Sequence, residues 1–317
     1  MGEEMQGVEG DTGWRKAIPE QRDRWQSRVL VALVSALLTA LCAYSVFAAY
    51  PQATSFTALP VEAVEISLGF ALTVRALQAA TPGGAVCGGM ICFLITLWTG
   101  SFTEPILKTG LTPLLLLFVL TFFSTRAGRT KKARTGLAEG RRGRNAAQVI
   151  ANLSVAAMSV SPQAVSQVQR WMACCCVSER LDAWAFQVVK VMCVAALVDA
   201  TADTVSSEIG QAFGGYPVLI VALRRVEPGT DGAVTFLGSC AGIAAGAIVA
   251  IAGGWAIHLS LRAVLTALAA GICGLFFDSL LGATVERRGW IGNDLVNFTS
   301  TLFAAVLAAI IYRFVVL

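Results

Sequence analysis

The amino-acid sequence predicts an all-α fold, a polytopic transmembrane helical bundle of roughly eight or nine spans. Of the 317 residues, 56% are hydrophobic and only 14% are charged, and the mean hydropathy is +0.68. A soluble domain carries about 25% charged residues. Several apolar runs also approach or exceed the roughly 20 residues that a helix needs to cross a bilayer. Together these observations predict a multi-pass integral membrane protein.

The elements follow one another without a second domain. Residues 1–28 form a polar segment that we interpret as a cytosolic tail, and residues 29–317 form one membrane domain. The acidic start is unlike a secretory signal or a transit peptide, which favours the endoplasmic reticulum or another endomembrane over a plastid. Glycine, proline and charged residues divide the membrane domain into nine candidate spans, at 29–50, 63–80, 83–99, 110–124, 146–161, 184–203, 233–257, 262–285 and 293–315.

Basic residues predict the orientation. The loop at 125–145 carries many lysines and arginines against a single acid, Glu139, so the positive-inside rule places it in the cytosol. With nine alternating spans, Arg28, Arg224–Arg225 and Arg287–Arg288 fall on the same side.

The segment "DATADTVSSEIG" at 199–210 places acids within an apolar run. Asp199, Asp203, Ser206 and Ser207 share one helical stripe, and Glu208 lies partly round the helix or just past its end. Intramembrane acids indicate function, and carboxylates beside hydroxyls suit Mg²⁺, which takes one or two carboxylates plus substrate phosphates. The alternative is hydrogen bonding between packed helices.

A second acidic segment, "FFDSLLGAT", ends the run at 262–285. Asp278 and Ser279 repeat the acid–hydroxyl pattern of the first segment, and Gly282 permits close helix contact. A bent, capped helix end is the alternative interpretation. In the predicted topology both acidic segments reach the cytosolic face, where the asparagines at 145, 152, 293 and 297 also lie.

The loop "RRVEPGTDGAVTFLG" at 224–238 has features of a phosphate-binding turn. Arg225 precedes a turn at Pro228–Gly229, and Thr230 or Asp231 is placed to cap the next helix. A glycine-rich helix N-terminus suits an anion, although no Walker A sequence follows. Glycines at 232, 238, 242 and 246 allow backbones to approach closely.

Arg141 and Arg142 lead directly into the polar segment that begins at Asn145. Their planar guanidinium groups suit bidentate phosphate binding, while a topology signal beside anionic head groups is the alternative. No aromatic residues interleave the basic loop, so nucleic-acid binding is not predicted. With a single histidine and no CxxC pair beside histidines, the nine cysteines do not predict a zinc site either.

Four segments taken in order, "AEGRRGRNAAQVIAN", "DTVSSEIG", "LRRVEPGTDGAVTFLG" and "FFDSLLGATVERRG…NDLVN", resemble the transmembrane protein 19 family over roughly residues 65–315. That family includes phytyl-phosphate kinases of tocopherol and phylloquinone synthesis. The resemblance implies phosphoryl transfer from CTP or UTP, with Mg²⁺, to an isoprenyl (phytyl) monophosphate at the cytosolic membrane face. The implied partners are the lipid bilayer, the nucleotide and the isoprenyl phosphate.

The resemblance also implies roles for individual residues. The catalytic and metal-binding positions are Asp203, Glu208 and Asp278. The nucleotide- and phosphate-binding positions are Arg141, Arg142, Asn145, Asn152, Ser207, Arg225, Thr230, Asp231, Gly232, Ser279, Asn293 and Asn297. Two residues depart from the family pattern, because Leu153 and Ala233 stand where glycine is usual.

Three alternatives stay open at the level of sequence. One is a related CTP-using enzyme, such as a polyprenol kinase or a cytidylyltransferase. Another is a transporter, which inverted repeats would favour. Residues 203–207 and 278–282 share a faint sequence repeat, but both segments run inward, which fits two parallel helices better than an inverted pair. The third is a non-catalytic membrane protein of the same fold.

Overall fold

A computed structural model describes residues 18–49, 58–100, 104–134, 143–173 and 181–316. Its helices are α1 (Glu20–Ala49), α2 (Ala58–Ala76), α3 (Pro82–Thr99), α4 (Leu111–Arg126), α5 (Arg129–Arg134), α6 (Ala146–Ser159), α7 (Pro162–Ala173), α8 (Leu181–Phe213), α9 (Phe236–Ala256), α10 (Leu261–Leu281) and α11 (Asn293–Val316). A 3₁₀ turn η2 (Ile106–Lys108), a π-helical turn η3 (Gly282–Glu286) and an antiparallel ribbon of β1 (Val218–Leu219) and β2 (Ala233–Val234) complete the described structure.

The helical, polytopic architecture is confirmed, but the number of spans is lower than predicted. Each of the nine apolar runs forms helix, yet only six helices of the described chain are long and apolar enough to cross a membrane. The pair α6–α7, bent by 62°, brings the number to seven if it forms one broken span. Helices α2 and α4 do not qualify as membrane spans, because α2 carries Glu62, Glu65 and Arg75 and α4 has only 16 residues.

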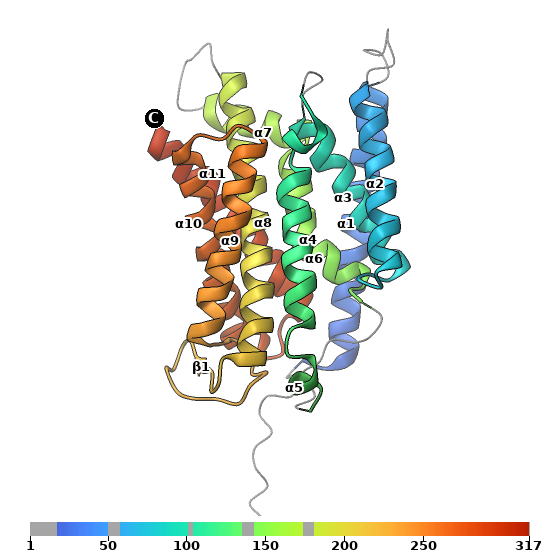
Figure 1. The fold of residues 1–317 in the computed structure, drawn as a ribbon. Helices are drawn as coiled ribbons and strands as arrows, with labels where there is room; N and C mark the ends of the chain where they lie inside the picture. Colours follow the sequence, from blue (N-terminus) through green and yellow to red (C-terminus); the bar gives the residue numbers. More distant parts are fainter. Residues whose placement is uncertain (1–17, 50–57, 101–103, 135–142, 174–180, 317) are drawn as a thin grey trace, which may run out of the picture.

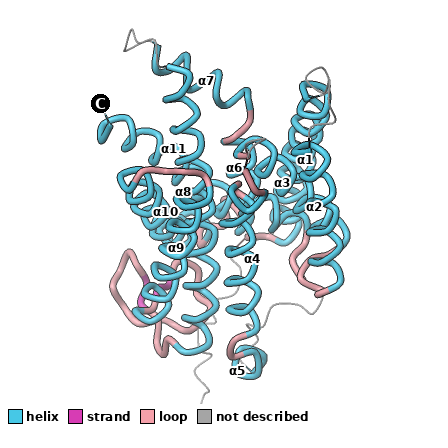
Figure 2. The backbone as a smooth tube through the Cα atoms, turned by 45° about the horizontal axis from the view of Figure 1, so that its top comes forward, coloured by secondary structure: helices cyan, strands magenta, loops and turns pink. Residues whose placement is uncertain are grey.

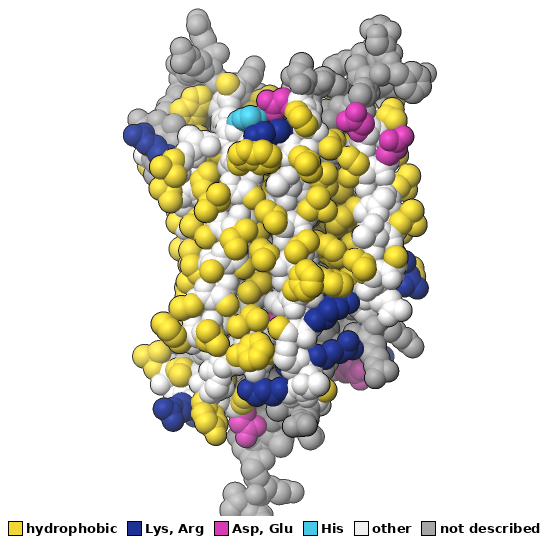
Figure 3. Space-filling model, viewed as in Figure 1, with side chains coloured by type: hydrophobic (Ala, Val, Ile, Leu, Met, Phe, Trp, Pro, Cys, Tyr) yellow, Lys and Arg dark blue, Asp and Glu magenta, His cyan; other side chains and the backbone are white. Residues whose placement is uncertain are grey.

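The helices run up and down along one long axis, with the β ribbon and α5 at one end and α7 at the other (Figure 1). Viewed from the tilted direction, α8–α11 and α1–α3 form two groups, with α4 between them (Figure 2). Hydrophobic side chains cover the middle of the visible surface, while charged side chains gather toward its ends (Figure 3). This distribution is that of a protein whose middle faces hydrocarbon.

Helix α8 forms the centre of the fold. It packs against α4, α6, α9, α10 and α11, and its residues from Val188 to Val198 are mostly buried. A helix that is apolar on all sides belongs in a core of this kind. Close packing on α9 depends on glycines, because a Cβ at Gly238 or Gly242 would lie within 2.5 Å of a backbone oxygen of α8. The predicted close approach of these glycines is therefore confirmed.

The basic segments meet at one end of the bundle. Arg22 of α1 donates to the Gly289 carbonyl oxygen (3.0 Å), and Lys132 of α5 pairs with Glu208 of α8. Arg225 lies in an isolated bridge with Val218, beside the β ribbon. The end that carries α5 and β1 in Figure 1 is thus the basic end predicted by the charge pattern.

Candidate functional site

A polar cavity of about 260 Å³ opens at this basic end. Its walls are the start of α6, the C-terminal part of α8, the loop 217–235, the end of α10 with η3, and the start of α11. Five carboxylates line it: Asp203, Glu208, Asp231, Asp278 and Glu286. Because α8 and α10 run in the same direction, the acids of both helices reach one cavity.

Two glycines bring the loop 228–235 onto the end of α10. Gly232 has a φ of +72°, and a Cβ there would lie 2.2 Å from the Ala283 nitrogen. A Cβ on Gly282 would lie 2.8 Å from the Gly232 nitrogen. At this contact the helix widens into the π-helical turn η3, a local geometry that is frequent at functional sites.

Helix caps fix the two neighbouring loops. The Asn145 side chain accepts a hydrogen bond from the Gln148 amide (3.0 Å), and the Gln148 side chain accepts from the Asn145 amide (2.9 Å). Helix α9 is capped by Thr235, which accepts from the Gly238 amide (3.1 Å). The expected cap at Thr230 or Asp231 is therefore wrong, because the chain continues through β2 before α9 begins.

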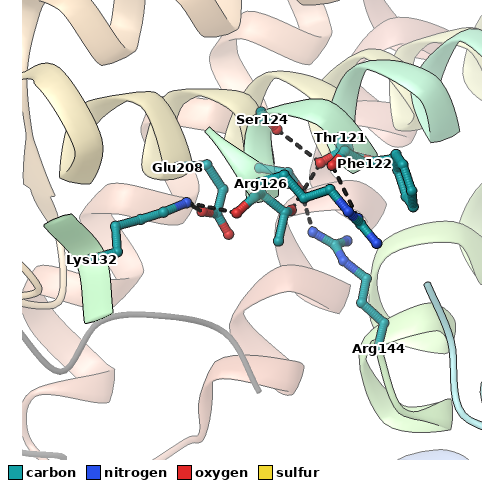
Figure 4. A network of polar contacts seen from close by, with 9 residues as sticks. Thr121, Phe122, Ser124, Arg126, Lys132, Arg144 and Glu208 are labelled. Carbon is teal, nitrogen blue, oxygen red and sulfur yellow. Dashed lines mark hydrogen bonds and ion pairs between the residues drawn. The ribbon is translucent and has the colours of Figure 1, made fainter. Parts of the chain in front are cut away.

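Arg144 is held in position by hydrogen bonds from its backbone to the turn between α2 and α3. Its amide donates to the Ala79 carbonyl oxygen and its carbonyl oxygen accepts from the Thr81 amide, both at 2.9 Å. Its side chain lines the polar cavity and donates to the Thr204 hydroxyl oxygen at 3.3 Å. In Figure 4 the guanidinium group points toward Arg126 at the end of α4. A cation thus stands in the cavity wall, within electrostatic range of Asp203.

Glu208 pairs with a lysine that is almost entirely buried. Lys132 is 1% exposed, contacts the Glu208 carboxylate and donates to the Thr125 carbonyl oxygen at 2.9 Å. The ion pair joins α5 to α8 beside the polar cavity (Figure 4). Glu208 therefore has a structural contact in addition to its place in the cavity wall.

Asp199 and Asp278 occupy different surroundings. Asp199 is completely buried and accepts a hydrogen bond from the Ser300 hydroxyl at 3.1 Å. It lies behind Gly274, outside the cavity lining, although the sequence places it on the stripe of Asp203. Asp278 lines the cavity, and its buried Oδ2 has no hydrogen-bond partner among the residues that the structure describes.

The family model described as integral membrane protein DUF92 matches residues 65–305, which is most of the chain. The chain belongs to the DUF92 integral membrane family. This confirms the resemblance to the transmembrane protein 19 family. No solved structure matches the chain.

DUF92 relatives occur in archaea, cyanobacteria and plants. An uncharacterized membrane protein of Methanocaldococcus jannaschii is 36% identical over 38% of this chain, an alignment that covers 50% of the relative. One of Synechocystis is 29% identical over 61% of this chain and 71% of the relative. Protein VTE6, chloroplastic, of Arabidopsis thaliana is 27% identical over 62% of this chain and 57% of the relative. The alignments thus span only about half of the archaeal and plant proteins.

Most residues predicted for the site lie in the lining of the polar cavity of this DUF92 protein: Asn152, Asp203, Ser207, Glu208, Thr230, Asp231, Gly232, Asp278, Ser279, Asn293 and Asn297. Two described residues do not: Asn145 caps α6, and Arg225 lies in the bridge with Val218. The other two predicted phosphate-binding residues, Arg141 and Arg142, fall outside the described residues.

The sequence interpretation missed several residues that line the cavity. The polar ones among them are Arg144, Gln148, Thr204, Gln211, Thr235 and Glu286. Arg144 had a usable signal, because it belongs to the same basic run as Arg141 and directly precedes Asn145, the cap of α6. Glu286 had none, since only the π-helical turn brings it to the cavity.

The acids of the polar cavity do not form a complete metal site. No three Asp, Glu, His or Cys side chains in the described ranges converge closely enough to hold a metal ion. Asp278 does lie within electrostatic range of Asp203 and Glu286. This donor set suits an ion such as Mg²⁺, which takes one or two protein carboxylates and obtains its other oxygens from water and phosphates.

Proposed function

We propose that this protein transfers the terminal phosphoryl group of a nucleoside triphosphate, CTP or UTP, to an isoprenyl monophosphate at the cytosolic membrane face. The observation that carries the proposal is the polar cavity, which joins two acidic helix ends, a glycine turn and Arg144 in one place. The choice of reaction is supported by the resemblance to a family that includes phytyl-phosphate kinases.

In the proposed reaction the bond between the β and γ phosphates breaks as a lipid phosphate oxygen bonds to the γ phosphorus. A nucleoside diphosphate leaves, and the lipid monophosphate becomes a diphosphate. The acceptor oxygen is already anionic near neutral pH, because the second pKa of a phosphate monoester is about 6. The protein therefore needs to position the phosphates and balance their charge rather than remove a proton.

The residues of the cavity divide these tasks. Asp203 and Asp278, on neighbouring helix ends, would hold a Mg²⁺ ion bound together with the nucleotide, and Glu208 would assist from the side paired with Lys132. Such an ion neutralises phosphate charge when bound. Arg144 would orient the transferred phosphoryl group, and the turn at Thr230–Gly232 would hold the donor phosphates.

The transporter alternative receives no support from the helix directions. Inverted repeats would place the two acidic segments at opposite ends, whereas α8 and α10 bring them to the same cavity.

The test is phosphoryl transfer by the purified full-length protein in detergent. Labelled CTP, UTP and ATP are offered with phytyl, geranylgeranyl and dolichyl monophosphates, with and without Mg²⁺. We expect Mg²⁺-dependent diphosphate formation, reduced at least about 100-fold in Asp203→Asn and in Asp278→Asn. Glu104→Gln is the matched control, because this acid pairs with His258 at the far end of α9. Equal activity in all variants would place the site elsewhere.

A further inference from the structure

A second, apolar cavity lies beside the polar one, between α2, α3, α4 and α6. Phe70 of α2 meets Phe118 of α4 edge-on, with ring centroids 5.8 Å apart. Both cavities share Arg144 and Asn152 in their linings. The apolar lining includes Phe70, Val74, Leu114, Leu117, Phe118 and Leu153.

Arginines line one end of this apolar cavity. Arg126, Arg129 and Arg144 all belong to its lining. Arg126 donates to the Leu77 and Phe122 carbonyl oxygens, both at 3.3 Å, and its guanidinium carbon lies 3.4 Å from the centroid of the Phe122 ring (Figure 4). In the part of the chain that the structure describes, no carboxylate pairs with Arg126 or Arg129. Basic side chains also gather beside the lower half of α4 on the surface seen in Figure 3.

We propose that the apolar cavity binds the hydrocarbon chain of the acceptor, an isoprenyl monophosphate, with its phosphate held by Arg126, Arg129 and Arg144. The inference rests on the proposed function and extends it to the lipid. It places the acceptor phosphate where the two cavities meet, beside Arg144 and Asn152. An apolar tail with a single anionic head matches an apolar cleft that ends in cations.

The dimensions of the cleft favour one short chain over a two-chain lipid. The helical stretch from Leu114 to Arg126 spans about 18 Å along α4, roughly half of the ~30 Å hydrocarbon core. A longer polyprenyl tail would extend beyond the cleft into the bilayer. Phe70 of α2 and Phe122 of α4, both in the lining, are partly exposed. We therefore expect a chain to enter between these helices from the hydrocarbon without passing through water.

Two glycines offer a matched pair of substitutions for the chain-binding part. A Cβ on Gly88, in the lining, would contact Phe70 at 3.5 Å, an ordinary packing distance, so Gly88→Leu fills the cleft. A Cβ on Gly69 would have nothing within 4 Å, so Gly69→Leu adds the same bulk outside the cleft.

For the head-group part the test variant is the double substitution Arg126→Gln and Arg129→Gln. Both side chains are exposed, so the fold does not depend on burying them. Arg75→Gln is the control, since Arg75 is exposed in the last turn of α2 and outside the cavity lining.

The experiment measures equilibrium binding of labelled geranylgeranyl monophosphate to the full-length protein in detergent, without nucleotide. We expect Gly88→Leu and the double arginine variant each to weaken binding by about tenfold or more, with both controls unchanged. Geranylgeraniol and inorganic phosphate should compete poorly, because each lacks one half of the ligand. The inference is overturned if phosphatidic acid or inorganic phosphate competes equally well, or if both test variants bind like the unaltered protein.

Phosphoryl transfer in the same variants separates the two proposals. The unaltered protein could transfer no phosphate and yet bind the lipid, with binding lost in the test variants. That result would support the lipid site and reject the proposed reaction. Transfer that proceeds normally in Gly88→Leu and in the double arginine variant would support the reaction and reject this lipid site.

Discussion

Lys132 lies buried where α5 meets α8, and its ammonium group pairs with Glu208. The two partners differ in exposure, since the lysine side chain is 1% exposed and the glutamate side chain 15%. Removing the glutamate leaves a cation that water cannot reach, whereas removing the lysine leaves a carboxylate that water partly hydrates. Removal of Glu208 should therefore cost more stability than removal of Lys132.

This asymmetry predicts how substitutions change thermal unfolding in detergent. Glu208→Gln should destabilise the protein by about 3 kcal/mol, because it leaves a buried charge unpaired. Lys132→Met should be milder, and the double variant should be more stable than Glu208→Gln alone. Glu20→Gln, which breaks the exposed pair with Arg24, should change stability by less than about 1 kcal/mol. Equal destabilisation by the two single substitutions would contradict the asymmetry.

At the scale of elements, the contact between the loop 228–235 and the end of α10 forms one wall of the polar cavity. The contact depends on Gly232, whose positive φ and missing side chain are both needed. Gly215 has nearly the same φ, +73°, but a Cβ there would have nothing within 4 Å. The two glycines separate the effect of backbone strain from the effect of close approach.

We expect Gly215→Ala to cost only the strain of a left-handed residue, about 1 kcal/mol. Gly232→Ala should cost clearly more and should also reduce phosphoryl transfer, because Ala283 forces the loop away from the cavity. Thermal unfolding and transfer rates of the two variants make the comparison. Similar behaviour of both variants would mean that the loop does not need this contact.

At the scale of the whole molecule, the basic end and the end that carries Glu104 and His258 should lie on opposite sides of the membrane. Single cysteines at Glu227 and Arg288, both exposed, should react with a membrane-impermeant maleimide from the cytosolic side of sealed vesicles. A cysteine at Glu104 should react only from the other side. The background needs Cys240 and Cys273 replaced, which are the exposed thiols of the described chain. It also needs Cys174, Cys175 and Cys176 replaced, which lie outside the described residues. Labelling of all three positions from one side would reject the predicted topology.

Much of the helical pattern follows from the sequence, because long apolar runs between breaks leave little choice of structure in a membrane. The span count does not follow, since the sequence does not show that α6 turns by 62° into α7. Glycine contacts were predictable where small residues recur along one helix face, as at Gly238 and Gly242.

The polar residues were harder to assign. Asp199 and Asp203 share a stripe in sequence, but α10 and α11 cover only Asp199. Arg144 owes its place in the cavity wall to backbone bonds with the turn between α2 and α3, a partner remote in sequence. Helical periodicity identifies which residues share a face, whereas only tertiary packing decides which part of that face meets a cavity.

The walls of the apolar cleft also differ in how firmly they are held. Helix α8 is enclosed by α4, α6, α7, α9, α10 and α11, whereas α2, within the described chain, packs extensively only on α3. Across the cleft, α2 meets α4 through the ring contact of Phe70 with Phe118, and the turn after α2 meets α4 through the bond from Arg126 to the Leu77 carbonyl oxygen. Among the helices that line the cleft, α2 would therefore break the fewest contacts by moving outward. We expect a membrane lipid to enter and leave the cleft past this helix, while the other helices keep their positions.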